Sequence, residues 1–183
     1  SFEGLNKAGS RMDFAKLENL NAHYIKEADD KRLFDLMVGL TDELSFEVQK
    51  AGLLAHEETV LRALPLLKPR AKTILDLITG AEFIFAQRPL QFEEKALKAL
   101  DEDSVEMLRA LQPELAAIEN WDHDTINDVM RGFADAKELK FGKVAQPLRA
   151  ALTAKAASPG CFDVLELFGK DESLSRLKET TGV

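Results

Sequence analysis

Apolar residues recur three and four positions apart along most of this 183-residue chain, whereas no alternating apolar–polar pattern runs for more than four residues. Spacings of three and four place side chains on one face of an α-helix, and alternation would place them on one face of a strand. The pattern therefore predicts an all-α protein. The expected helices occupy residues 13–28, 29–40, 57–67, 73–78, 93–100, 105–118, 122–138, 144–154, 161–169 and 172–179.

Two prolines are expected to kink or stop the helix of residues 57–67. Pro65 and Pro69 each lack a backbone N–H and disfavour helical geometry in the preceding residue. A stop in this segment would leave Lys68 and Arg70 at a helix junction. Their side chains would then project from a fixed backbone rather than from a mobile loop.

A boundary between two parts of the chain is expected near Pro89, which follows an apolar stretch without helical periodicity. We expect two consecutive helical subdomains, residues 1–89 and residues 90–183. The chain begins without an initiator methionine and in the middle of a pattern. We therefore also expect it to be a piece of a longer protein.

Charge is unevenly distributed along the sequence, whose net charge is −8. Residues 62–72 carry four basic side chains and no acid, and residues 130–155 carry six basic side chains and two acids. Each segment therefore has a net charge of +4, and the remainder has −16. Such segregation is expected where a polyanion is bound at one place and repelled elsewhere, although an acidic net charge by itself argues against nucleic acid.

Other bulk features favour a protein of the cytoplasm. No apolar run approaches the ~20 residues that a membrane helix needs, so no membrane partner is expected. The start of the sequence has no apolar signal-peptide core. The single cysteine, Cys161, has no second cysteine in the chain with which to form a disulfide, which fits a reducing compartment.

One cluster of possible metal ligands stands out at residues 122–124, Asp-His-Asp, with Asp128 one turn later. The favoured interpretation is a helix start, because an aspartate caps a helix and acids stabilise its first turn. His23 and His56 are isolated. The sequence shows no Ser-His-Asp arrangement, glycine-rich phosphate loop or His-Glu-x-x-His motif, so we expect no catalytic residue, metal site or cofactor site.

Two aromatic residues have both a structural and a functional interpretation. Trp121 at a helix start is expected to lie in the core rather than to stack on a base. Phe162 follows a Pro-Gly turn, and it either packs between helices or forms a wall against an unstacked base. Arg70 and Arg149 each lie near a proline, and a guanidinium in an acid-poor segment suits a base edge or a phosphate.

Four stretches together resemble the C-terminal, anticodon-binding half of bacterial glutamyl-tRNA synthetases. They are FAKLENLNAHYI at residues 14–25, LLKPRAKTILDL at 66–77, RGFADAKELKFGKVAQPLRAALT at 131–153 and SPGCFDVLELFGK at 158–170. The resemblance spans essentially the whole chain, and the last two stretches are the most specific. It implies two helical subdomains that form a cage around the anticodon loop.

The resemblance also implies roles for individual residues. Arg70 matches the arginine that reads the third anticodon base, and Arg149 matches the arginine beside the first. A Ser-Pro-Gly turn flanks the anticodon, and it is matched by Ser158, Pro159 and Gly160, with Phe162 following. The phosphate backbone is expected to lie against Lys68, Lys72, Lys140 and Lys143.

As a whole, the family attaches glutamate to its tRNA with ATP. The resemblance places that chemistry, with ATP and Mg²⁺, in an upstream domain whose motifs are absent here. The implied partner is tRNA(Glu), bound by a monomer, with no DNA partner. A helical protein-interaction scaffold that has lost tRNA binding stays an alternative, and an enzyme in its own right is disfavoured for want of a site. Salt-dependent tRNA binding separates the first two, because phosphate contacts release counterions.

Overall fold

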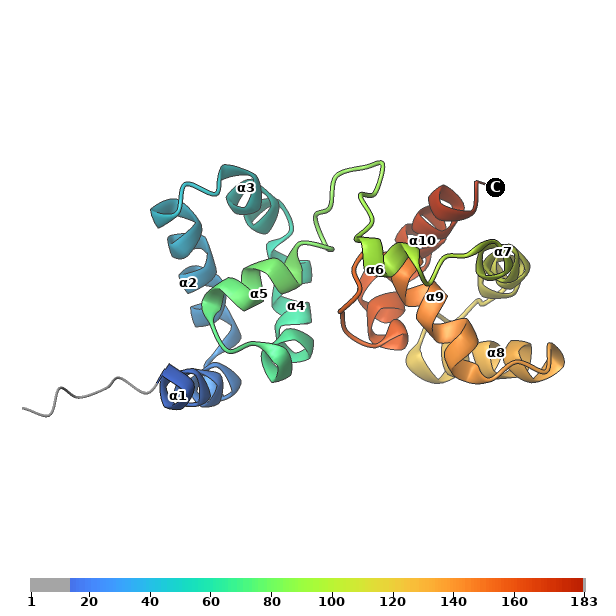
Figure 1. Ribbon diagram of the computed structural model, residues 1–183, viewed down its shortest axis with the longest axis horizontal. Helices are drawn as coiled ribbons and strands as arrows, with labels where there is room; N and C mark the ends of the chain where they lie inside the picture. Colours follow the sequence, from blue (N-terminus) through green and yellow to red (C-terminus); the bar gives the residue numbers. More distant parts are fainter. Residues whose placement is uncertain (1–13, 183) are drawn as a thin grey trace, which may run out of the picture.

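The computed structural model describes residues 14–182, and within that range all regular structure is helical (Figure 1). The all-α prediction is confirmed, whereas residues 1–13 of the predicted first subdomain lie outside the described residues. No helix in the described range is both long and apolar enough to cross a membrane. The elements are α1 (Phe14–Glu27), α2 (Asp30–Glu43), α3 (Glu47–Ala55), α4 (Glu57–Leu67), the 3-10 helix η1 (Lys68–Arg70), α5 (Ile74–Ala81), α6 (Glu94–Leu97), α7 (Glu102–Ala116), α8 (His123–Ala136), α9 (Phe141–Thr153) and α10 (Cys161–Thr181).

The helices fall into two groups, α1–α5 and α6–α10, joined by an irregular segment (Figure 1). We call residues 82–93 the linker. In the first group α2 packs against α3, α4 and α5, and in the second α10 packs against α7, α8 and α9. The groups also pack on each other through α4 and α10, and one cluster of buried apolar side chains includes residues of both. The division into subdomains at residues 89 and 90 stays a prediction.

The junction after α4 lies where it was expected, directly after a helix of residues 57–67. Pro65 lies inside α4, and the helix continues to Leu67. Pro65 has no N–H to donate within the helix, and Leu64 and Leu67 on either side of it are buried. The helix ends where Pro69 begins the 3-10 turn, so Lys68 and Arg70 do lie at a helix junction.

The next helix, α5, starts with a reciprocal cap that fixes the chain just after this junction. The Thr73 hydroxyl accepts the Asp76 N–H at 3.1 Å, and the Asp76 carboxylate accepts the N–H groups of Thr73 and Lys72, each at 2.9 Å. Such a capping box satisfies N–H groups that a helix start leaves unpaired. The backbone is therefore held on both sides of η1.

Helix α3 is absent from the sequence-based expectation, because Leu53 is its only buried side chain and leaves almost no apolar stripe. Its Gly52 lies against the ring of Phe85 from the linker, where a Cβ atom would collide with the ring. The long helix α10 contains Gly169 in a left-handed conformation, with φ 72°. This break separates the two helices that were expected at residues 161–169 and 172–179.

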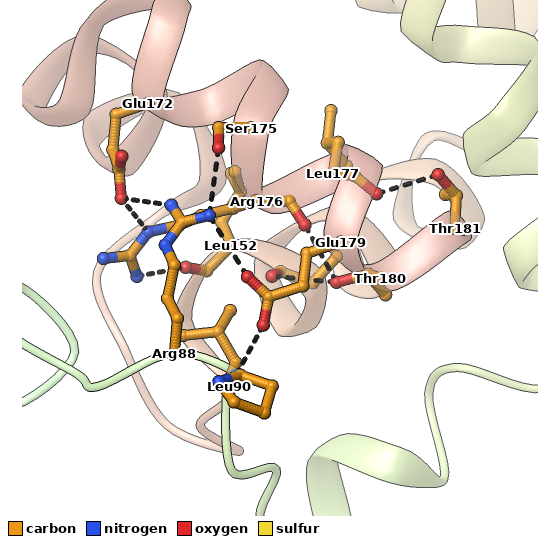
Figure 2. A network of polar contacts seen from close by, with 12 residues as sticks. Arg88, Leu90, Leu152, Glu172, Ser175, Arg176, Leu177, Glu179, Thr180 and Thr181 are labelled. Atoms are coloured by element: carbon orange, nitrogen blue, oxygen red, sulfur yellow. Dashed lines mark hydrogen bonds and ion pairs between the residues drawn. The ribbon is translucent and has the colours of Figure 1, made fainter. Parts of the chain in front are cut away.

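A buried arginine ties the linker to the second group (Figure 2). Arg176 is 2% exposed, and its guanidinium donates to the carbonyls of Phe83 and Leu152, each at 2.8 Å. Its Nε donates to the Glu172 carboxylate at 2.6 Å, and its guanidinium carbon lies 4.0 Å from the centre of the Phe168 ring. Linker, α9 and both halves of α10 thus meet at one charged group.

A second arginine extends this network to the surface (Figure 2). Arg88 of the linker pairs with Glu172 at 2.7 Å and with Glu179 at 3.1 Å, and Glu179 accepts the backbone N–H of Leu90 at 2.5 Å. Burial alone would raise the pKa of Glu172, but Arg176 and Arg88 outweigh it and hold that pKa below its ordinary value. The carboxylate stays charged at neutral pH.

Replacing Arg176 by methionine should destabilise the fold by about 2–5 kcal/mol, because two buried carbonyls lose their donors and Glu172 loses a partner. Urea unfolding followed by circular dichroism measures the difference. Lys178→Met, at an exposed position of the same helix, is the matched control and should change stability by less than about 0.5 kcal/mol. Equal unfolding midpoints for the two variants would show that Arg176 does not hold the linker.

Candidate nucleic-acid interface

A groove of about 590 Å³ lies where η1 and α5 face the loop between α9 and α10. We call residues 154–160 the recognition loop. Both helix groups and the linker contribute to the groove, so it exists only in the assembled fold. Its charged lining residues are Arg70, Lys72, Asp76, Glu93, Lys95 and Lys155. Cations therefore outnumber acids in the groove of a protein whose net charge is −8.

The two arginines predicted to lie at the anticodon both contact the recognition loop. Arg70 is exposed, and its Nη1 donates to the carbonyl of Ser158. Arg149 is half-buried, and its Nη2 donates to the carbonyl of Ala156 at 3.4 Å. A guanidinium has five N–H donors, so both side chains keep donors for a ligand.

The predicted Ser-Pro-Gly turn lies at the end of this loop. Ser158 and Pro159 line the groove with nearly buried side chains, whereas Gly160 is half-buried. The Gly160 N–H donates to the Asp163 carboxylate at 3.2 Å, which closes the first turn of α10. The structure therefore brings Arg70, Ser158 and Pro159 together at one groove, with Gly160 next to them.

Phe162 lies in an aromatic cluster rather than in the lining of the groove. Its ring stacks on Phe141, with 5.5 Å between ring centres, and tilts against His123 at 5.3 Å. The Arg131 guanidinium lies 5.0 Å from the centre of the Phe141 ring. Phe162 therefore packs between helices in this structure. A contact between Phe162 and a base stays a prediction.

The four lysines predicted to meet phosphates lie in different settings. Lys68 is only 13% exposed, donates to the Ala28 carbonyl at 2.6 Å and pairs with Asp30, so it ties the α1–α2 turn to η1. Lys72 lines the groove and pairs with Glu18 at 3.2 Å.

The other two, Lys140 and Lys143, are exposed at the start of α9, away from the groove lining. Lys143 lines a second, smaller cavity of about 160 Å³ together with Lys95 and Lys98. Lys95 thus borders both cavities, and the sequence analysis missed it. Residues 93–98 contain two acids and two bases, so this segment does not stand out as basic.

The expected helix start at residues 122–124 is confirmed. Asp122 caps α8 by accepting the Thr125 N–H at 2.8 Å, and this hydrogen bond holds the Asp122 pKa below its ordinary value. Trp121 packs against the core and donates its Nε1–H to the Leu165 carbonyl at 2.9 Å. The described part of the chain contains no group of three side chains suited to hold a metal ion.

Comparison with known proteins gives a family match and close relatives. The family model described as an anticodon binding domain matches residues 17–181. The chain is 43% identical over 179 residues to glutamate–tRNA ligase 1 of Bartonella bacilliformis, covering 97% of this chain and 38% of that protein. It is 45% identical over 176 residues to glutamate–tRNA ligase 2 of Zymomonas mobilis, covering 96% and 36%.

The fold also matches solved structures. A glutamate tRNA ligase from Elizabethkingia meningosepticum superposes with a TM-score of 0.70 and 24% identity, covering 91% of this chain and 32% of that one. At that identity the likeness shows the fold. The chain spans less than two fifths of the length of the curated relatives that it matches.

The cysteine beside the recognition loop should react slowly. Burial raises the pKa of the Cys161 thiol to about 11. At pH 8 about one thiol in a thousand is then ionised, and only the thiolate is nucleophilic. Alkylation by iodoacetamide should therefore be about 100-fold slower in the folded chain than in the same chain unfolded in urea. Equal rates in the two states would show that the thiol is not buried.

Proposed function

Because the chain belongs to the anticodon binding domain family, we propose that it forms the anticodon-binding part of a glutamate–tRNA ligase and binds the anticodon loop of tRNA(Glu). The observation that carries this function is the groove in which Arg70 meets the recognition loop. Two relatives that match nearly the whole chain at 43% and 45% identity are both named glutamate–tRNA ligases, which supports the choice of tRNA.

The chemistry of the groove suits a single-stranded RNA loop. Proteins read such loops through the edges of unstacked bases, while cations hold the phosphates. Lys72 and Lys95 lie on the lining of the groove and can meet phosphates there. Outside the two basic segments the chain has a net charge of −16, so electrostatic attraction directs RNA to those segments and away from the rest of the protein.

Arg70 is the residue that we assign to the third anticodon base. It follows Pro69 in η1, and the Ser158 carbonyl orients its guanidinium. Glutamate codons begin with G, so the third anticodon base is C. Cytosine and uracil share the O2 acceptor and differ at position 4, so rejection of uracil must also involve fit and unpaired groups. Arg149 is assigned to the first base.

The ligation reaction itself is assigned to another part of a longer protein. The 183 residues contain no glycine-rich phosphate loop, and the described residues hold no group of three metal-ligating side chains. We therefore assign neither ATP nor Mg²⁺ to this chain. Action in the cytoplasm follows from the proposed role in translation, and the monomeric state stays a prediction.

Salt dependence tests RNA binding against the protein-interaction scaffold. An anticodon stem–loop hairpin of tRNA(Glu) should bind with an affinity that falls linearly with salt on a double-logarithmic plot. Two to four neutralised phosphates would give a slope of about −1.4 to −2.8 in single-stranded RNA. Fluorescence anisotropy with a labelled hairpin measures it, and a hairpin with a scrambled loop is the control. Absence of saturable binding at low salt would favour the scaffold.

Replacing Arg70 by glutamine should weaken the preference for C over the other bases at the third anticodon position. Losing a paired base contact reduces discrimination by about 1–3 kcal/mol, or roughly 5- to 150-fold. Hairpins that differ only at that base measure the effect, and the salt slope should change by no more than about one unit. Lys72→Ala is the control for loss of a charge in the same groove.

The Lys72→Ala variant should weaken binding to all hairpins equally. If Arg70→Gln does the same, Arg70 is a phosphate anchor and its assignment to base reading is wrong. Thermal unfolding of both variants checks that the fold is intact, since Arg70 also bonds to the recognition loop.

A further inference from the structure

The recognition loop is held in place from the linker by one glutamate. The Glu93 N–H donates to the Ala154 carbonyl at 2.9 Å. One carboxylate oxygen of Glu93 accepts the Ala156 N–H at 2.9 Å, and the other lies 3.5 Å from the Lys155 ammonium. Glu93 therefore contacts three consecutive residues at the point where α9 ends, with Ala154 in a left-handed conformation at φ 57°.

The same loop carries the carbonyls that orient both arginines. The Ala156 carbonyl accepts a hydrogen bond from Arg149, and the N–H of the same residue donates to Glu93. The Ser158 carbonyl accepts from Arg70. The two arginines are 79 residues apart in sequence, yet both donate to this short stretch of backbone. A change in the path of the loop would therefore shift the acceptors of both.

We propose that Glu93 is a positioning residue for anticodon recognition, because its carboxylate fixes the backbone that orients Arg70 and Arg149. The inference rests on the proposed function. Its mechanism is pre-organisation: donors already held in the binding geometry lose less freedom when the RNA binds.

Lys155 of the recognition loop also pairs with the linker. Partial burial disfavours its charge, but hydrogen bonds and charge from Glu82 and Glu93 outweigh burial and raise its pKa. Its ammonium lies 2.9 Å from the Glu82 carboxylate. Because Lys155 pairs with Glu82 and Glu93 of the linker, it helps to hold the recognition loop against the linker.

A purely electrostatic role for Glu93 leads to the opposite expectation. Glu93 is an acid on the lining of a basic groove, so removing its charge should tighten binding to every RNA. A positioning role predicts instead that the preference for the matching anticodon falls. The two explanations therefore predict different ratios of the affinity for the matching hairpin to the affinity for a mismatched one.

The test uses the 183-residue chain and three anticodon stem–loop hairpins. One has the anticodon CUC, one has U in place of the third anticodon base, and one has G in place of the first anticodon base. Glu93→Ala should reduce the preference for CUC about tenfold at both positions. It should leave binding of the two mismatched hairpins unchanged or tighter. Arg70→Gln, by contrast, should reduce the preference mainly at the third base.

Glu94→Ala is the matched control for charge. Glu94 lies one residue away, its side chain is 85% exposed, and its carboxylate pairs with Lys98 at 3.0 Å. Its replacement removes the same charge without touching the recognition loop, so all three affinities should change by the same factor. Glu93→Gln keeps an oxygen acceptor for the Ala156 N–H and should restore the preference. Failure of the glutamine variant to restore it would overturn positioning by this hydrogen bond.

Hydrogen exchange of the free protein gives a readout that needs no RNA. The Ala156 amide should exchange about tenfold faster in Glu93→Ala and at the wild-type rate in Glu94→Ala. If the wild-type chain prefers CUC and Glu93→Ala keeps that preference at both positions, Glu93 does not position the arginines although the proposed function stands. If the wild-type chain shows no preference among the hairpins, the proposed function fails and this inference fails with it.

Discussion

The buried guanidinium of Arg176 constrains how the linker lies on the second group of helices. A charge without hydrogen-bond partners is too costly to bury, so the carbonyls of Phe83 and Leu152 must remain beside it. That requirement places the start of the linker on α9 and α10. The linker is held again at Leu90, whose N–H donates to Glu179, and it then reaches the recognition loop at Glu93. The candidate site thus depends on a group that does not line the groove.

The helices that could be predicted from sequence are those whose apolar stripes are long enough to show a period. Helix α8 buries Ile126, Met130 and Phe133 at spacings of four and three, and its Asp122 cap is a local signal. Helix α3 buries Leu53 alone, so its position is determined by packing that the sequence does not display. Pro69 is a local signal of the same kind, because α4 ends directly before the 3-10 turn that contains it.

In the candidate site, too, some residues have a local sequence signal and others are placed only by tertiary contacts. Charge counting found the segments of Arg70 and Arg149 because both segments are poor in acids. It could not show that Lys68 turns inward to Asp30. Glu93 and Ala156 are 63 residues apart, and Arg176 and Phe83 are 93 apart, so neither contact leaves a local signal. The roles of single residues came from the resemblance to a family, because neither charge nor periodicity distinguishes one arginine from another.

Gly169 allows the two halves of α10 to pack in different directions. The break in α10 rotates the residues after it relative to those before it, so the two halves do not share a common face. Val164 and Leu165 lie buried in the first half, and Leu177 and Arg176 lie buried in the second. No single apolar stripe therefore runs along residues 161–181. One continuous helix can therefore pack Val164 and Leu165 in one direction and turn Arg176 towards the linker in another.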